Sequence, residues 1–275
     1  MAENRTLWDE WTEVHVGSDF YDVDEFRRGG SRLRDFEQAL IGDVRGRDVL
    51  PLQCHFGLDT LSFARLGAHP TGADFSPKAI AAARALAAEL GLDAKFVESN
   101  LYDLPANLEG DFDLVYTSGG VLGWLPDIRR WAQVVAHFVR PGGRVVIAEI
   151  HPVANAFENE GIQPGELRLA YPYWEHAEPM TFEVQGSYAD PSAALATKVE
   201  FGWDHGLGQI VSALVDAGLR IDALREYPFC LWTLGYTVQG PDGYWHLPGD
   251  LDGKLPLFFS IVATKPVARE PVLGT

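Results

Sequence analysis

Residues 49–60, VLPLQCHFGLDT, decide the fold of this chain, because they have the outline of a strand, a tight loop and the start of a helix. The apolar run at 49–52 predicts the strand, and the helical pattern LSFARLGA follows at 61–68. In doubly wound sheets this first turn is the usual ligand contact, and glycine is favoured because a Cβ would collide with the ligand. Here Gln53 and His55 stand where glycine is usual, and only Gly57 remains.

Around this stretch, residues 47–150 alternate short β-branched runs with helical periodicity, which is typical of a parallel sheet covered by helices. A strong helix signal begins at Ser76 as N-cap, with Pro77 in first position, and runs to Gly91. Asp127 opens a second amphipathic helix. The expected strands are 48–52, 69–74, 94–100, 111–119, 141–150, 221–229 and 257–265. We therefore expect an α/β fold with a doubly wound, mostly parallel seven-stranded sheet.

The chain is expected to be a single domain of four parts. Residues 47–151 form the cofactor-binding core, and residues 1–46 an N-terminal lid. Residues 152–202 carry many aromatic residues without helical period, which indicates an insertion of extended pieces that covers the site. Residues 203–265 supply a closing helix and strands, and the tail from 267 is expected to be frayed.

Composition restricts the partners. The chain has 275 residues, 47% of them hydrophobic, and a formal net charge of -17. Phosphate binding needs clustered lysine and arginine, so we expect no nucleic-acid partner and no membrane, and a neutral or cationic small molecule fits better. No apolar run approaches the ~20 residues that cross a bilayer, and the N-terminus is polar, so we expect a cytoplasmic protein. Cys54 and Cys230 have no metal-ligand spacing and are expected to be buried thiols.

An acid follows the loop at a sequence spacing close to that of the ribose-binding acid in dinucleotide-binding folds. Asp74 closes the second expected strand, 17 positions after Gly57 (74 minus 57). In dinucleotide-binding folds an acid roughly 20 residues beyond the loop accepts hydrogen bonds from ribose hydroxyls. A nicotinamide oxidoreductase would need a G-x-G-x-x-G loop, of which only Gly57 is present, so that class is disfavoured.

The ordered set VLPLQCHFGLDTLSFARLGA, TGADFSPKAI, ESNLYDLP, DFDLVYTSGGVLGWLPD and VRPGGRVVIAEIHP resembles the class I S-adenosylmethionine-dependent methyltransferases over roughly residues 49–152. The nearest likeness is to a bacterial, small-molecule-type branch whose glycine loop reads LQCHFG. The flanking stretches SDFYDVDEF and WDHGLGQIVSALVDAGLRIDALREYP are also similar to that branch.

The resemblance assigns the cofactor S-adenosyl-L-methionine to the loop. Gln53, His55 and Gly57 match its three glycine positions, and Pro51 stands where the family has an acid that orients the methionine amine. Pro51 cannot act as that acid, so another group must do so. We expect the loop to bind the cofactor, with the amide and imidazole replacing some backbone contacts; the alternative is a degenerate turn without a ligand.

The resemblance also implies contacts beyond the loop. The residues expected to make these contacts are Asp74 at the ribose, Phe75 beside the adenine, Asn100 and the Leu101 amide at the adenine edge, Thr117 to Gly119 facing the methyl donor, and Tyr21 from the lid. Tyr21 and Phe26 could equally anchor the lid by burial alone.

Two histidines are the candidates for catalysis. His151 follows the fifth expected strand, where an imidazole could take a proton from a hydroxyl or amine, or simply turn the chain before Pro152. His205 is either a base from the covering segment or, with Asp204, the cap of the next helix. Methyl transfer can also proceed by positioning alone.

The resemblance implies transfer of a methyl group to an oxygen or nitrogen of a small molecule, by a monomer or homodimer. Two alternatives stay open: the same fold and cofactor could serve a non-methylating cyclisation or decarboxylation, or the chain could bind the cofactor without catalysis.

Overall fold

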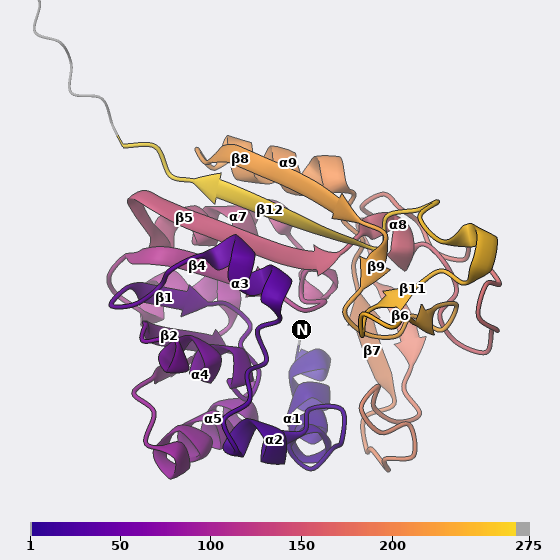
Figure 1. The fold of residues 1–275 in the computed structure, drawn as a ribbon, viewed down its shortest axis with the longest axis horizontal. Coiled ribbons are helices and arrows are strands. Elements are labelled where there is room, and N and C mark those ends of the chain that lie inside the picture. Colours follow the sequence, from indigo (N-terminus) through magenta and orange to yellow (C-terminus); the bar gives the residue numbers. More distant parts are fainter. Residues whose placement is uncertain (1, 268–275) are drawn as a thin grey trace, which may run out of the picture.

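The computed structural model describes residues 2–267, and its centre is a seven-stranded sheet of order β3-β2-β1-β4-β5-β12-β8 (Figure 1). β1 to β5 run parallel, and β12 is antiparallel to both β5 and β8. The strands are β1 (Asp48–Pro51), β2 (His69–Asp74), β3 (Lys95–Glu98), β4 (Phe112–Ser118), β5 (Val139–Ile150), β8 (Arg220–Tyr227) and β12 (Phe258–Thr264). The expected α/β sheet is therefore confirmed.

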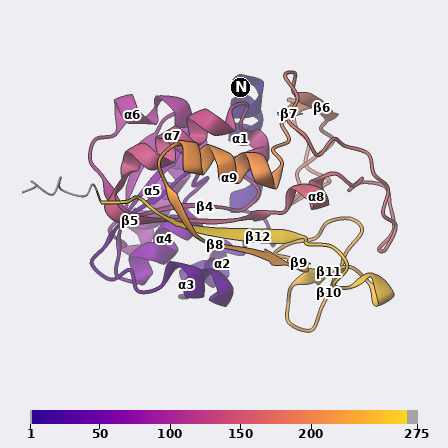
Figure 2. The same ribbon diagram turned by 90° about the horizontal axis from the view of Figure 1, so that it is seen from above.

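Helices cover both faces of this sheet. Figure 2 shows α7 and α9 on one side and α3 and α4 on the other. The helices associated with the core are α4 (Leu58–Arg65), α5 (Pro77–Leu90), α6 (Leu104–Asn107), α7 (Ile128–Phe138), α8 (Pro152–Asn155) and α9 (Leu207–Asp216). Trp131 and Phe138 of α7 are fully buried against the sheet residues Val145 and Ile147. Strand order reverses between β1 and β4, which is the place where such sheets bind ligands.

Local chemistry explains where the helices begin and end. Ser76 Oγ accepts a hydrogen bond from the Ala79 amide at 3.0 Å, Pro77 takes the first position of α5, and Gly91 ends it with φ 63°. Asp127 caps α7 through the Arg129 and Arg130 amides. These are the boundaries that the sequence predicts.

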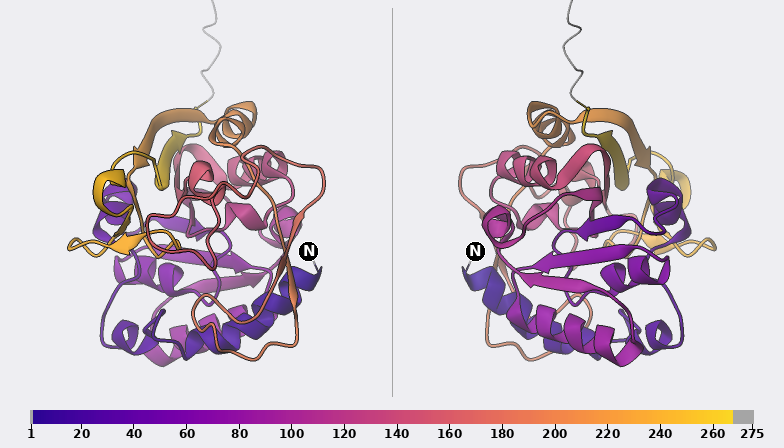
Figure 3. Two further views of the ribbon diagram at one scale, coloured as in Figure 1. Left: turned by 90° about the vertical axis from the view of Figure 1, so that its right-hand side faces the viewer. Right: turned by 90° about the vertical axis from the view of Figure 1, so that its left-hand side faces the viewer.

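The N-terminal segment is helical, which the sequence analysis did not specify. It contains α1 (Ala2–Val16), α2 (Val23–Arg27) and α3 (Asp35–Ile41). α1 runs beside α5, as both views of Figure 3 show, and it also contacts β7 of the insertion. Leu7 and Trp11 are buried on its inner face. The helix thus joins the edge of the core to the insertion.

The insertion at 152–202 contains α8 and an antiparallel hairpin of β6 (Met180–Glu183) and β7 (Val199–Gly202). A small three-stranded sheet that the sequence analysis missed follows β8: β9 (Phe229–Cys230), β10 (Val238–Gln239) and β11 (Trp245–His246). Within residues 2–267 no helix has the length and apolar character that a membrane crossing requires. Most of the tail expected to be frayed, residues 268–275, lies outside the described residues.

Candidate functional site

A cavity of about 1340 Å³ opens at the carboxyl ends of β1, β2 and β4. Its lining comes from the loop after β1, the N-terminal segment, the loop after β4 and the insertion. A single small-molecule site usually occupies ~300–1,000 Å³, so this central cavity has room for two ligands. The carboxylates in its wall belong to Glu37, Asp59, Asp74, Glu149, Glu160, Glu183, Glu200 and Asp204, and the guanidinium groups to Arg32 and Arg34. This charge balance favours a cationic ligand.

The loop after β1 keeps a glycine-like backbone without the glycines. Gln53 and His55 have φ of 53° and 50°, and Gly57 has φ 83°. Side chains with a Cβ rarely adopt this left-handed conformation. The positions that resemble the three family glycines therefore have the conformation that glycine would favour. At Gly57 glycine is also a packing requirement, because a Cβ would lie 2.6 Å from the Phe96 ring.

Asp74 at the end of β2 holds this loop in place. Its Oδ2 accepts from the His55 amide at 2.8 Å and its Oδ1 from the Ser76 amide at 2.9 Å. The side chain is 7% exposed and lines the cavity. Burial raises the pKa of Asp74 to about 6, although the backbone donors oppose that rise. Each carboxylate oxygen can accept a second hydrogen bond, so the acid can serve both the loop and a ligand.

Two side-chain atoms of the loop have no partner in the described part of the chain. Gln53 donates from Nε2 to the Val121 carbonyl at 3.0 Å, but its buried Oε1 has no partner. His55 has an unpartnered, buried Nδ1, while its Nε2 lies 2.8 Å from His15 Nδ1. Buried polar atoms are normally satisfied, so these two atoms are candidate contacts for a ligand.

The N-terminal segment and the insertion meet above the loop. Tyr21 lies with its hydroxyl 2.5 Å from that of Tyr188, and Trp11 donates from Nε1 to the Gly186 carbonyl. Trp8 packs edge-on against His55 and Trp124. Tyr21, Trp8 and Trp11 of the N-terminal segment line the cavity together with Tyr188 of the insertion, so this segment lies over the loop.

Two further acids, Glu37 and Asp59, line the cavity near the loop, and neither was predicted from the sequence. Glu37 of α3 is 4% exposed and accepts from the Tyr116 hydroxyl at 2.5 Å. Asp59, in the first turn of α4, accepts from Ser118 Oγ at 3.3 Å. Burial and the neighbouring Asp59 raise the pKa of Glu37 to about 7, and burial raises the pKa of Asp59. The position of Asp59 two residues after Gly57 was a usable sequence signal; Glu37 had none.

Alternate residues at the end of β4 line the cavity. Tyr116 and Ser118 line the cavity, whereas Thr117, which was expected to face the methyl donor, does not. Successive strand residues point to opposite faces, so Thr117 faces away and is fully buried, with Oγ1 unpartnered among the described residues. Gly119 lies on the cavity wall as expected.

Glu149 fixes the loop that follows Gly119. Its carboxylate accepts from the amides of Gly120 and Val121 at 2.7 Å and of Leu122 at 3.1 Å. The side chain is 3% exposed, and burial raises its pKa. Since its oxygens are already occupied by backbone donors, Glu149 is a scaffold for the cavity wall.

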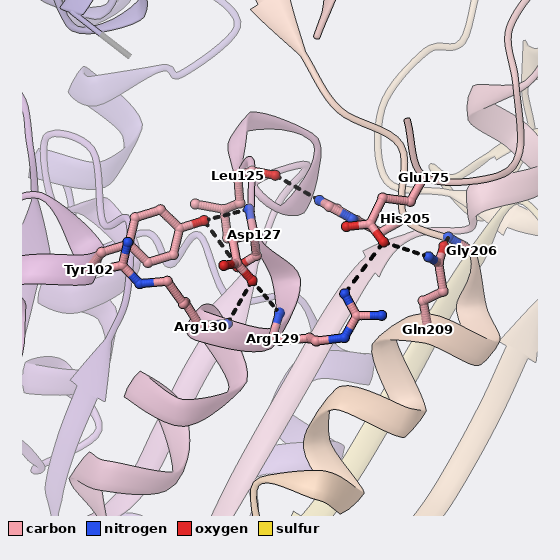
Figure 4. Close-up of polar contacts among 9 residues, drawn as sticks. All are labelled: Tyr102, Leu125, Asp127, Arg129, Arg130, Glu175, His205, Gly206 and Gln209. Atoms are coloured by element: carbon pink, nitrogen blue, oxygen red, sulfur yellow. Dashed lines mark hydrogen bonds and ion pairs between the residues drawn. The ribbon is translucent and has the colours of Figure 1, made fainter. Parts of the chain in front are cut away.

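His205 lines the cavity, and one of its imidazole nitrogens has no partner among the described residues. Its Nε2 donates to the Leu125 carbonyl at 2.7 Å, so the proton is on Nε2, and Nδ1 is buried without a partner in the described part of the chain (Figure 4). The residue is 5% exposed and lines the cavity. Burial lowers its pKa, which keeps the ring neutral at pH 7. Next to it, Asp204 has a buried Oδ2 without a partner among residues 2–267.

Polar contacts hold the surroundings of His205 together. Glu175 of the insertion accepts from Gln209 Nε2 at 2.9 Å and lies 3.6 Å from the Arg129 guanidinium, which ties α7 and α9 together (Figure 4). Gln209 Oε1 in turn accepts from the Gly206 amide. The helix cap that was considered for His205 is therefore provided by Gln209.

His151 does not reach the cavity. Its Nδ1 accepts from the Val153 amide at 3.1 Å, and its Nε2 lies 2.9 Å from Glu226 Oε1. It is 4% exposed and lies outside the cavity lining. The expected catalytic role of His151 is thus not supported, because capping α8 turns the ring away; the alternative of a chain-turning residue fits its contacts.

The remaining expected contacts lie on the cavity wall. These are Phe75, Asn100 and Leu101. Asn100 Oδ1 accepts from the Tyr102 amide at 2.9 Å, which fixes the turn that presents Leu101. Opposite them, Tyr171 and Phe182 pack their rings edge to face, and Trp203 and Trp232 also line the cavity. Trp174, by contrast, is 68% exposed and takes no part.

Comparison with known proteins identifies the core. Residues 49–143 match the family described as methyltransferase domain. The chain is 33% identical over 116 residues to a ubiquinone biosynthesis O-methyltransferase of Cronobacter sakazakii, covering 42% of this chain and 47% of that protein. It is 35% identical over 108 residues to the protein of the same name from Aromatoleum aromaticum, covering 39% and 46%. The chain thus spans about half the length of these relatives.

Solved structures agree on the fold. An S-adenosylmethionine-dependent methyltransferase from Mesorhizobium loti superposes with TM-score 0.58 at 23% identity, over 82% of this chain and 94% of that one. A glycopeptide N-methyltransferase complexed with S-adenosylmethionine gives TM-score 0.55 at 20% identity, over 86% and 93%. The resemblance found in the sequence is therefore confirmed for the domain at 49–143 and for the fold.

Proposed function

We propose that this chain, whose residues 49–143 form a methyltransferase domain, transfers a methyl group from S-adenosylmethionine to an oxygen or nitrogen of a small molecule. The observation that carries the proposal is the loop after β1, which keeps three left-handed residues and a buried acid facing one cavity. A turn that had lost its ligand would have no reason to keep two strained side chains there, at a cost of about 1 kcal/mol each.

The residues present fit the cofactor. Asp74 offers carboxylate acceptors to ribose hydroxyls, and Phe75 and Leu101 line the adjoining wall. Gln53 Oε1 and His55 Nδ1 are buried atoms that lack a partner in residues 2–267, and a bound ligand would supply one. The carboxylates in the wall suit the positive sulfonium, whose chemical contribution is an electrophilic methyl group. The cavity volume leaves room for an acceptor molecule beside it.

The chain's own contribution is positioning and proton transfer. The N-terminal segment over the loop limits the poses of an acceptor, and such positioning can supply most of the rate enhancement. His205 Nδ1 has no partner within residues 2–267 and belongs to a neutral ring, so this nitrogen is the candidate to take the proton of an acceptor hydroxyl or amine. The Leu125 carbonyl stabilises the resulting imidazolium through Nε2.

The activity is tested by incubating the protein with S-adenosylmethionine and a panel of phenols, other alcohols and amines. Methyl transfer must yield S-adenosylhomocysteine in proportion to methylated product. Turnover of the cofactor without a methylated product would instead indicate a non-methylating reaction. Binding without turnover of any member of the panel would favour a cofactor-binding protein without catalysis.

A further inference from the structure

Pro51 leaves the site without an acid at the end of β1, yet buried carboxylates lie on the same face of the sheet. Pro51 and Tyr116 are lateral partners in the parallel pair β1–β4, and the Leu52 amide donates to the Tyr116 carbonyl at 2.9 Å. Lateral partners point to the same face. The Tyr116 hydroxyl donates to Glu37 Oε1, so this carboxylate is anchored to the residue beside Pro51, on the face that an acid at 51 would use.

Asp59 reaches the same region from the other end of the loop. It follows Gly57 by two residues, and its Oδ2 accepts from Ser118 at the tip of β4. Glu37 and Asp59 both line the cavity, and after burial the Asp59 charge is the next cause of the raised pKa of Glu37. Two neighbouring buried carboxylates favour a cation between or beside them.

The nearby Arg34 and Arg32 act to lower the pKa of Glu37 and Asp59, respectively, but burial outweighs them and both pKa values stay raised. Arg34 donates to the Leu231 carbonyl and lies over the Tyr244 ring, and Arg32 donates to the Phe20 carbonyl. In the described part of the chain neither Glu37 nor Asp59 forms an ion pair within 4.0 Å. A separate observation also indicates a missing donor: Gln53 Oε1, two residues after Pro51, is buried and unpartnered in the described residues.

We infer that Glu37 and Asp59 bind the amino group of the cofactor's methionyl end, in place of the strand-end acid that Pro51 has replaced. The inference rests on the proposed function. Glu37 comes from the N-terminal segment, so the segment that covers the loop also completes its recognition of the cofactor. The chemistry is that of an ammonium group with three donors facing carboxylate acceptors, and charge-assisted hydrogen bonds are the strongest available to it.

The test is calorimetric titration with two ligands, S-adenosylhomocysteine and its analogue in which the α-amino group is replaced by hydrogen. The variants are Glu37→Gln and Asp59→Asn, both nearly isosteric. The matched control is Glu109→Gln, which removes an exposed carboxylate outside the cavity lining. We expect roughly 10- to 100-fold weaker binding of S-adenosylhomocysteine to both variants, and unchanged affinity for the deaminated analogue. The control should bind both ligands as the wild type does.

Two outcomes overturn the inference. One is unchanged affinity of both variants for S-adenosylhomocysteine. The other is an equal loss for both ligands, which would mean that the carboxylates only support the fold of the cavity, for example through the bond from Tyr116 to Glu37. Failure of the wild type to bind S-adenosylhomocysteine at all is a different result, because it would contradict the proposed function itself.

Discussion

His15 of α1 and His55 of the loop after β1 are joined by a direct contact between their imidazoles, with His15 Nδ1 2.8 Å from His55 Nε2. His15 Nε2 also lies 2.6 Å from Ser187 Oγ of the insertion. One fully buried ring thus links the three segments that enclose the cavity. Only one proton can lie between the two nitrogens, so this contact requires that the rings are not both protonated.

Acid should weaken this link. Burial lowers the pKa of His15 from 6.5 to about 3, so its stabilising contribution is complete above pH 6.5 and is lost as the pH falls toward 3. We expect His15→Gln to be less stable than the wild type at pH 7.5, by about 1–2 kcal/mol for the altered bonds. Between pH 7.5 and 5 the variant should lose less Tm than the wild type. Parallel Tm profiles for the two proteins would contradict the role of His15.

The left-handed loop positions predict an unusual preference for glycine. At His55, φ of 50° is unfavourable for any residue with a Cβ. His55→Gly should therefore be more stable than His55→Ala by about 1 kcal/mol, although alanine is normally the better replacement. The same order is expected at Gln53. Urea denaturation of the four variants measures these differences, and an alanine variant at least as stable as its glycine counterpart would refute the assigned conformation.

Gly57 should tolerate no side chain. A Cβ there would lie 2.6 Å from Phe96 Cε1 and 3.0 Å from the Ala83 Cβ, and φ is 83°. We expect Gly57→Ala to destabilise the protein by about 2–4 kcal/mol, from overpacking and backbone strain together. Phe96→Leu in the same chain should recover part of this loss. Additive losses in the double variant would show that the Phe96 contact is not the cause.

Substitution of His205 and substitution of His151 should have different effects on kcat. His205→Gln removes the free Nδ1 at the cavity, so kcat should fall by roughly 10²- to 10⁴-fold while affinity for S-adenosylhomocysteine is retained. His151→Gln should lower Tm through the lost contacts with Val153 and Glu226 and leave kcat within about threefold. Equal kcat for His205→Gln and the wild type would favour transfer by positioning alone.

The fold was predictable because its signals are local. The caps at Ser76, Gly91 and Asp127 and the alternation of strand and helix patterns set the element boundaries to within a few residues. The loop was predictable for the same reason, since Gln53, His55 and Gly57 are positions in one continuous motif. The short strands β9 to β11 were missed because two-residue strands leave no periodicity to detect.

The site was predictable only where chain position decides side-chain direction. Asp74 and Phe75 end a strand at the cavity, and their place follows from the sheet. Thr117 lies one residue away from the strand positions that line the cavity, and a shift of one residue reverses the face of the sheet. Glu37, which lines the cavity, and His15, which contacts Ser187 of the insertion, come from helices whose packing depends on contacts across more than 40 residues, and no sequence spacing records such contacts.

The central claim is that the loop after β1 binds S-adenosylmethionine with Asp74 as its acid. It is tested most directly by calorimetric titration of S-adenosylmethionine and S-adenosylhomocysteine into the wild type, Asp74→Ala and the exposed control Asp43→Ala. We predict micromolar binding to the wild type and the control, and affinity at least ~10-fold weaker in Asp74→Ala. Absence of binding to the folded wild type, or undiminished binding to Asp74→Ala, would contradict the account.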